Sequence, residues 1–248
     1  MYSTYNIRTM FSMLNANGKP NPASKYTCSV TSISDIKHAF YINLDERTDR
    51  KAYVEQQLAS VGLDQVAQRF KATKTEHGAL GCSISHYKCL LNAIVNRWDH
   101  VLICEDDITF TNPALFVNQL NKCLSNPGLK WDVIMLAGNN AAPYTVIDDS
   151  CVKINRCITT TGYLVNKHYM RTLADNMKEG ATLFMKNPTL GIKYAVDTYF
   201  AHLQRQDMWL LITPLTVTQQ EGYSDIEQKH TNYARLMLNL DKPYFSYL

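Results

Sequence analysis

Apolar and polar positions succeed one another along the chain in a pattern that predicts strands and helices in turn. Residues 38–44 form an apolar run, which predicts a buried first strand. The polar turn 45–49 follows, and a helix is then predicted from Arg50, because apolar residues recur there at helical spacing. Gly62 can take the left-handed conformation that ends such a helix. The first unit is therefore a strand, a loop and a helix.

The same patterns continue to the end of the chain. They predict further strands at 68–73, 101–104, 131–136, 152–165 (as one or two strands) and 209–218. They predict further helices at 81–96, 167–177 and 196–204, with a loose segment at 137–150. Strands that alternate with helices are typical of a sheet covered on both faces. We therefore expect an α/β fold, with helices flanking a mainly parallel sheet.

The first 36 residues do not share this pattern. Residues 15–24 collect Asn, Gly, Lys and two prolines with almost no apolar periodicity, as linkers do. A length of 248 residues suits one sizeable α/β domain. We expect residues 1–36 to form a flexible N-terminal arm and residues 37–248 to form a single domain.

The amino-acid composition limits which binding partners and which cellular compartment we expect for this protein. The chain has 25 Lys and Arg against 22 Asp and Glu, a net charge of +3, which gives no electrostatic reason to expect nucleic acid. We find no apolar run long enough to span a membrane, and no signal-peptide core at the start. Seven cysteines without a C-x-x-C pair are typical of reduced, buried thiols. We expect a cytoplasmic protein that does not bind nucleic acid.

Three adjacent acids, Glu105, Asp106 and Asp107, directly follow an apolar strand. Open α/β sheets bind their ligands at this end of a strand, and adjacent carboxylates repel one another unless a cation lies beside them. In an extended segment Glu105 and Asp107 would face the same side, and oxygen ligands suit Mg²⁺ or Mn²⁺ held jointly with a diphosphate. The alternative is an exposed acidic turn that caps the next element, and the spacing favours neither interpretation.

Two basic residues and a glycine-rich turn are further candidates. Arg47 and Arg50 flank the start of the first helix, where phosphate can bind. Without other information, surface ion pairs with neighbouring acids are the preferred interpretation of these arginines. The segment 78–86 can approach a ligand through its glycines and ends in His86, although a lone histidine is more often structural.

Two candidates lie further along the chain. Asp197 opens an apolar helical stretch and could be only an N-cap. The loop 219–226 follows the last predicted strand and could fold over a bound substrate. His230 lies just beyond and could reach a metal ion, although a solvent-facing histidine is the more common outcome.

Six motifs in a fixed order carry a family resemblance. They are Phe40-Tyr41-Ile42-Asn43-Leu44-Asp45 with Arg47, Asp49 and Arg50; Gly81-Cys82 with Ser85-His86; Glu105-Asp106-Asp107; Gly162-Tyr163-Leu164-Val165; Val196-Asp197; and Ser224-Asp225-Ile226. Together they cover about residues 38–230 and resemble glycosyltransferase family 25. That family includes lipooligosaccharide galactosyltransferases of bacteria and collagen galactosyltransferases.

The resemblance implies a GT-A type fold, which has a Rossmann-like, mixed but mainly parallel sheet flanked by helices. It also implies a UDP-sugar donor and a divalent metal, Mn²⁺ or alternatively Mg²⁺. It implies that Asp107 is the most direct metal ligand, with Glu105 as a further candidate. His230, named above for its position, completes the set of candidate metal ligands. Asp197 is then the candidate general base of an inverting transfer. The residues implied for donor binding are Asn43, Leu44, Arg47, Arg50, Ser85, Glu105 and Asp106.

We therefore expect a metal-dependent hexosyltransferase that moves galactose or glucose to a hydroxyl acceptor. The acceptor would be a glycan, a lipid-linked sugar or a collagen-like hydroxylysine, and a homodimer is a further expectation. One alternative is an inactive nucleotide- or carbohydrate-binding module on the same scaffold, and another is a metal-dependent phosphohydrolase. Two departures from the family pattern stand out: residues 77–80 replace an acid-bearing turn, and Glu46 occupies a position that is often basic.

Overall fold

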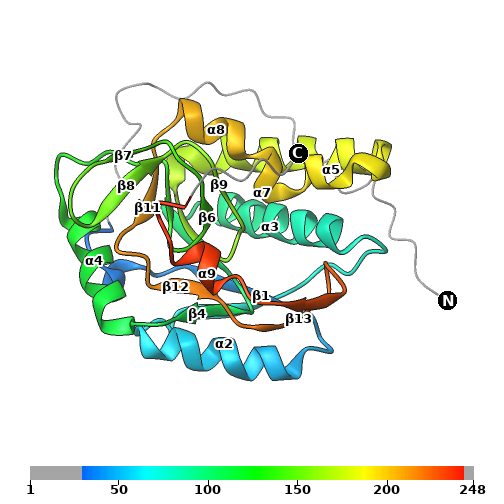
Figure 1. Cartoon of the computed structure of the whole chain (residues 1–248), viewed down its shortest axis with the longest axis horizontal. Coiled ribbons are helices and arrows are strands. Elements are labelled where there is room, and N and C mark those ends of the chain that lie inside the picture. The colour runs from blue at the N-terminus through cyan, green and yellow to red at the C-terminus, as the bar shows by residue number, and fades with distance from the viewer. Residues whose placement is uncertain (1–29, 243–248) are drawn as a thin grey trace.

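The chain folds around an eight-stranded mixed sheet in a computed structural model that describes residues 30–242 (Figure 1). Its strand order is β2-β1-β3-β10-β5-β11-β8-β7. The strands are β1 (Ala39–Asn43), β2 (Ala67–Lys71), β3 (His100–Glu105), β5 (Val133–Met135), β7 (Tyr144–Val146), β8 (Cys151–Ile154), β10 (Gly162–Asn166) and β11 (Trp209–Ile212). Strands β8 and β10 run against the other members of the sheet, which all point the same way. The mixed, mainly parallel sheet is thereby confirmed.

Helices and small sheets complete the architecture. The longer helices are α2 (Thr48–Ser60), α3 (Gly78–Val95), α4 (Pro113–Ser125) and α5 (Met170–Lys186). The shorter ones are α6 (Gly191–Tyr194), α7 (Val196–Tyr199), α8 (Ala201–Gln206), α9 (Ala234–Met237) and the 3-10 turns η2 (Ile33–Asp35), η3 (Lys167–Tyr169) and η4 (Pro188–Leu190). Two-stranded sheets pair β4 (Ile108–Phe110) with β12 (Val217–Gln219), β13 (Gly222–Ser224) with β14 (Lys229–Thr231), and β6 (Asn139–Asn140) with β9 (Cys157–Ile158).

Successive side chains of each strand point to opposite faces of the sheet, so the interior is divided into two apolar cores, one on each face. On β3, Leu102 belongs to the core that includes Leu58 of α2 and residues of α4. Its neighbour Ile103 belongs to the opposite core, with Leu90 of α3 and Leu173 of α5. Figure 1 shows α2 below the sheet and α3, α5 and α8 above it. A sheet packed on both faces fixes its strand ends, which is where the acidic residues lie.

Several predicted elements are confirmed with different bounds. Helix α3 starts at Gly78, three residues before the predicted start, and α5 extends to Lys186, well past the predicted end at 177. The predicted strand 209–218 is two strands, because Pro214 has no amide hydrogen to donate to a ladder. The predicted helix 196–204 is likewise divided into α7 and α8. Helix α4 and the β13–β14 hairpin were not predicted.

Part of the expected N-terminal arm is packed. Residues 1–29 of that arm lie outside the described residues. Val30 and Ile36 are buried in the core on the α2 side of the sheet. Within residues 30–242 we find six cysteines, all free, of which five are buried and Cys82 is partly buried. Over that same range, none of the helices has the length and apolarity that a membrane crossing would need.

The strand register explains why distant motifs meet. Strands β1 and β3 are parallel neighbours with Ile42 opposite Glu105, so Asn43 and the acidic triplet emerge at the same edge of the sheet. Strand β10 runs the other way, with Gly162 opposite Cys104, and the turn before it therefore arrives at this edge too. One edge of the sheet thus collects the first, third and fourth motifs of the sequence.

Candidate active site

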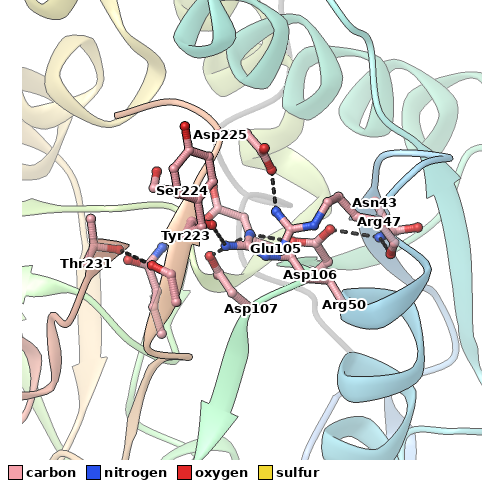
Figure 2. A network of polar contacts seen from close by, with 12 residues as sticks. Asn43, Arg47, Arg50, Glu105, Asp106, Asp107, Tyr223, Ser224, Asp225 and Thr231 are labelled. Atoms are coloured by element: carbon pink, nitrogen blue, oxygen red, sulfur yellow. Dashed lines mark hydrogen bonds and ion pairs between the residues drawn. The ribbon is translucent and has the colours of Figure 1, made fainter. Parts of the chain in front are cut away.

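Arg50 joins the two aspartates of the acidic triplet. Its Nη1 donates to Asp106 Oδ1 at 3.0 Å and to Asp107 Oδ2 at 3.1 Å, and its Nη2 donates to the carbonyl of Tyr223 at 3.0 Å (Figure 2). The three charged side chains are only 11–14% exposed. One guanidinium therefore faces two carboxylates in a largely dry environment, and the local charge is not fully balanced.

Asp107 keeps one carboxylate oxygen free. Its Oδ1 is buried and makes no hydrogen bond with the described residues. Burial, and then the neighbouring charge of Glu105, raise the pKa of Asp107 to about 8. A buried, unpartnered oxygen beside other carboxylates is suited to a hard divalent cation such as Mg²⁺ or Mn²⁺. The residues present therefore fit the metal that the sequence predicts at Asp107.

Asn43 is a buried connector between elements. Its Nδ2 donates to Asp106 Oδ2 at 2.8 Å and to the carbonyl of Arg47 at 3.0 Å, while its Oδ1 accepts from Arg69 Nε at 2.8 Å. Burial raises the pKa of Asp106, although Arg50 and Asn43 oppose that rise. Asn43 thus orients Asp106 and ties β1 to the start of α2. Sequence reasoning missed Arg69, because its place beside Asn43 depends on the pairing of β1 with β2.

The β13–β14 hairpin is fastened to α2 by the two arginines. Arg47 pairs with Asp225 and with Asp49, and Arg50 holds the Tyr223 carbonyl (Figure 2). Both arginines thus contact the segment that follows β12, which sequence reasoning expected to fold over a substrate. Arg47 also pairs with Asp49, as the ion-pair interpretation of the sequence predicts, and phosphate binding by the two arginines stays a prediction.

Glu105 points to different partners from those of Asp107. Its Oε1 accepts from Thr160 Oγ1 at 2.7 Å and lies 3.5 Å from His86 Nε2, and its Oε2 accepts from Gln219 Nε2 at 3.0 Å. Burial pushes the pKa of Glu105 upward, but His86 and Thr160 hold it below its usual value. The extended geometry assumed for 105–107 does not occur, because the chain turns at residues 106–107 directly after β3.

Asp197 is tied to the same region through a turn. Its Oδ2 accepts from the backbone amide of Thr159 at 3.0 Å, and its Oδ1 accepts from the amide of Thr198 at 2.9 Å. The N-cap of α7 is Ala195, so Asp197 lies inside the helix and is not its cap. Burial raises the pKa of Asp197. Because Thr160 bonds Glu105, residues 159–160 connect the two acids.

Three further residues that the sequence named as candidates lie in different surroundings. Leu44 is half-buried just after β1. Ser85 is fully buried, and its Oγ accepts from the amide of Thr73 and donates to the carbonyl of Gly81. His230 is exposed on β14, opposite Tyr223. The structure thus brings the arginines and aspartates together, and it places Ser85 in backbone contacts and His230 on the outer side of the hairpin.

Besides Arg69, sequence reasoning gave no individual role to two polar residues of the site, although one of them, Gln219, opens the loop 219–226 named above. Thr160 lies two residues before the Gly162 motif, and Gln219 ends β12. Both donate to Glu105. The motif that begins at Gly162 indicated that the preceding residues reach the site. Threonine and glutamine are common on protein surfaces, however, so the sequence alone gives no reason to choose these two.

The chain was compared with known proteins. Residues 72–198, about half of the chain, match the family "Glycosyltransferase family 25 (LPS biosynthesis protein)". Together with a Rossmann-like sheet that carries acids at its strand ends, this match defines a sugar-transferring class of protein. The chain belongs to glycosyltransferase family 25.

Curated relatives are longer proteins. The chain is 25% identical over 201 residues to procollagen galactosyltransferase 1 of Danio rerio, and 24% identical over 206 residues to procollagen galactosyltransferase 2 of Homo sapiens. These alignments cover 72% and 75% of the chain but 33% of each relative. The chain therefore spans about a third of the length of the curated relatives it matches.

Similar solved structures are more distant. A mannose-1-phosphate geranyltransferase from Thermus thermophilus shares 8% identity at a TM-score of 0.43, over 71% of this chain and 73% of that one. A Drosophila β-1,4-galactosyltransferase 7 mutant in complex with manganese, UDP-Gal and xylobiose shares 10% identity at a TM-score of 0.31, over 55% and 52%.

Proposed function

We propose that this chain is a metal-dependent hexosyltransferase of the GT-A type. It transfers galactose or glucose from a UDP-sugar to a hydroxyl group, with inversion at the anomeric carbon. Membership of family 25 supports sugar transfer, and the two curated relatives named as galactosyltransferases support a hexose donor. The observation that carries the proposal is the free, buried Oδ1 of Asp107 beside the Arg50 pair.

The donor side of the site is built from Arg50, Asp106 and Asp107, with Arg47 and Asn43 next to them. Asp107 would hold Mn²⁺ or Mg²⁺ through its free oxygen, and the cation supplies positive charge to the departing diphosphate. Arg47 and Arg50 offer forked donors that match phosphate oxygens. Asn43 would keep Asp106 in place through its own hydrogen bond. Arg50 could then release a carboxylate and bind a phosphate oxygen of the donor instead. Binding energy here comes from charge complementarity.

Asp197 is the proposed general base. Its carboxylate would take the proton from the acceptor hydroxyl as that oxygen attacks the anomeric carbon. Two backbone amides, from Thr159 and Thr198, hold the carboxylate in one orientation. Burial raises its pKa, which makes the carboxylate a better proton acceptor than an exposed aspartate.

The acceptor is proposed at the level of class. The curated relatives are named for procollagen, so a hydroxylysine acceptor is one proposal for this chain. A glycan or a lipid-linked sugar is the other, and the family description mentions LPS biosynthesis. A homodimer and a cytoplasmic location stay predictions.

A donor screen tests the function. The whole chain is incubated with each UDP-sugar, with and without Mn²⁺, and release of UDP is measured with water or candidate acceptors. We expect Mn²⁺-dependent release with UDP-galactose or UDP-glucose, and loss of release in Asp107→Asn. Asp149→Asn is a matched control, because Asp149 is exposed and pairs with Lys122 away from the site. NMR of the transferred sugar reports inversion.

Three outcomes would count against the proposal. Full activity in Asp107→Asn would remove Asp107 as metal ligand. Binding of UDP by calorimetry without turnover on any acceptor would favour an inactive binding module. Phosphate release from simple phosphate esters would favour a phosphohydrolase.

A further inference from the structure

A second group of potential metal ligands lies behind the acidic pair. Cys82 and His86 are four residues apart on α3 and therefore face the same side of the helix. Both point at Glu105, the last residue of β3. The Cys82 sulfur, a His86 ring nitrogen and a Glu105 carboxylate oxygen all lie within 4.8 Å of one another. Within residues 30–242, this is the group of three ligand atoms that could surround one ion.

One ligand atom in this group is unsatisfied. His86 is fully buried, and its Nε2 has no hydrogen-bond partner among the described residues. His86 Nε2 lies 3.5 Å from Glu105 Oε1, which is an ion-pair contact when the ring is protonated. The other ring nitrogen, Nδ1, is satisfied by the hydroxyl of Tyr163 at 2.8 Å. A buried imidazole nitrogen that faces a thiol and a carboxylate can serve as a metal ligand.

The two separations that involve Glu105 Oε1 are close to those of a tetrahedral metal site. Cys82 Sγ lies 3.6 Å from Glu105 Oε1, and His86 Nε2 lies 3.5 Å from the same oxygen. Bond lengths of about 2.3 Å to sulfur and about 2.0–2.1 Å to nitrogen and oxygen place tetrahedral ligands about 3.3–3.5 Å apart. These two separations suit a zinc-sized ion, and the third, between the Cys82 sulfur and a ring nitrogen of His86, is within 4.8 Å.

We propose that Cys82, His86 and Glu105 bind a zinc ion, at a site separate from the one at Asp107. A thiolate and an imidazole favour Zn²⁺, whereas carboxylates alone favour Mg²⁺ or Mn²⁺. The Cys82 thiolate and the Glu105 carboxylate balance the two positive charges, and the thiol proton leaves to solvent on binding. The acidic triplet is thereby divided between two ions of different chemistry, with Glu105 serving zinc and Asp107 serving the donor side.

The surroundings of the three ligands support this assignment. Metal-bound histidines generally bond a partner through their second nitrogen, and the Tyr163 hydroxyl occupies that position on His86. Thr160 and Gln219 donate to the two oxygens of Glu105 and orient the carboxylate. The zinc ion would join α3, the end of β3 and the turn 159–161, and so hold in place the turn that bonds Asp197. This inference is independent of the sugar donor.

Metal analysis of the whole chain tests the proposal. The protein is purified without chelators, dialysed against metal-free buffer and measured by inductively coupled plasma mass spectrometry. We expect about one zinc per chain, and its loss in Cys82→Ser and His86→Gln. Cys89→Ser is the matched control, since Cys89 is a buried cysteine on the same helix and outside the group. Asp107→Asn should keep its zinc even if it loses transfer activity.

Cobalt substitution tests the same site in the wild-type protein, and therefore does not depend on whether the variants fold. Metal-stripped wild-type protein is titrated with Co²⁺, and a thiolate-to-cobalt charge-transfer band in the near ultraviolet is expected at one equivalent. Absence of that band, or absence of zinc from the wild-type protein, would overturn the proposal. So would zinc that stays bound in both variants. All these readings are made without donor or acceptor, so they stand apart from failure of the proposed transfer activity.

Discussion

Arg50 and Asp107 are bonded through one carboxylate oxygen only. Arg50 Nη1 donates to Asp107 Oδ2 at 3.1 Å, while the other oxygen of Asp107 is buried and has no hydrogen bond to any residue from 30 to 242. The same nitrogen also serves Asp106 at 3.0 Å. Arg50 therefore offsets the buried negative charge only in part, and burial together with the charge of Glu105 still raises the pKa of Asp107 to about 8. This unequal balance is the electrostatic basis of the candidate active site.

Replacing Arg50 should destabilise the protein. Arg50→Gln leaves Asp106 and Asp107 largely buried without their cation, and breaking a buried pair in this way costs about 3–5 kcal/mol. We expect a loss near the lower end, about 3 kcal/mol, because all three side chains are slightly exposed. Urea unfolding of metal-free protein measures it. Arg171→Gln, which removes an exposed pair with Asp175, should change stability by less than about 1 kcal/mol. Equal losses in the two variants would contradict this view of Arg50.

Asp225 should control the hairpin and leave the fold intact. Its ion pair with Arg47 is partly exposed, with Asp225 at 44%, so Asp225→Asn should change the free energy of unfolding by less than about 1 kcal/mol. The β13–β14 hairpin loses one of its two arginine contacts, and limited proteolysis should cut residues 219–232 faster. Glu227→Gln removes an ion pair within the same hairpin and is the control. Unchanged proteolysis in Asp225→Asn would show that Arg47 does not fasten the hairpin.

Asp197 should act on turnover. Asp197→Asn removes the proposed base, and we expect kcat to fall by roughly 10²–10⁴-fold with little change in the KM for the donor. A base works only when deprotonated, and burial raises the pKa of Asp197. Wild-type activity should therefore rise with pH through a midpoint above 3.8, the ordinary value for this group. Asp175→Asn is an exposed control. A normal kcat in Asp197→Asn would exclude this residue as the base.

Thr160 should position Glu105 through its hydroxyl. Thr160 is buried, and Thr160→Val removes the 2.7 Å hydrogen bond to Glu105 Oε1 while keeping the shape of the side chain. Loss of a buried partner of a charged group costs about 1–3 kcal/mol, which thermal or chemical unfolding can detect. Thr160→Ser keeps the hydroxyl and should restore most of the stability. If Ser and Val behave alike, the contact to Glu105 contributes little.

Gly81 should not tolerate a side chain. A Cβ at this position would lie 2.4 Å from the carbonyl oxygen of Thr73, so Gly81→Ala forces α3 and the segment after β2 apart. We expect a loss of about 1–3 kcal/mol in the free energy of unfolding, in spite of the better helix propensity of alanine. Gly222→Ala is the control, because a Cβ at Gly222 meets nothing within 4 Å. A stable Gly81→Ala variant would show that this approach is not tight.

The order of elements could be predicted where local signals were strong. The apolar runs of β1 and β3 and the stripe of α2 are local patterns, and Gly62 takes the expected positive φ of 77° at the end of α2. The short strand β4 and helix α4 were missed. Helix α4 did carry local signals that were overlooked, namely the cap Asn112, the proline that follows it and an apolar stripe that includes Phe116. Strand β4 is short and depends on pairing with β12.

The candidate site was only partly predictable for the same reason. Arg50 and the acidic triplet stood out because several charges lie next to apolar strands, and adjacent charges are visible in a sequence. Their mutual contacts, and the roles of Arg69 and Gln219, depend on which strands are neighbours. Glu105 is the clearest example. It lies only two positions before Asp107, but the chain turns after β3, so Glu105 bonds Thr160 whereas Asp107 bonds Arg50.

The sequence by itself determined the α/β class, the family and the residue types available for chemistry, because these follow from local periodicity and ordered motifs. Tertiary structure decided which of those residues meet. The parallel register of β1 with β3 places Asn43 beside Asp106, and the antiparallel entry of β10 places Thr160 beside Glu105. Such contacts join residues about 55–63 positions apart, and long-range packing of a sheet, not local propensity, selects them.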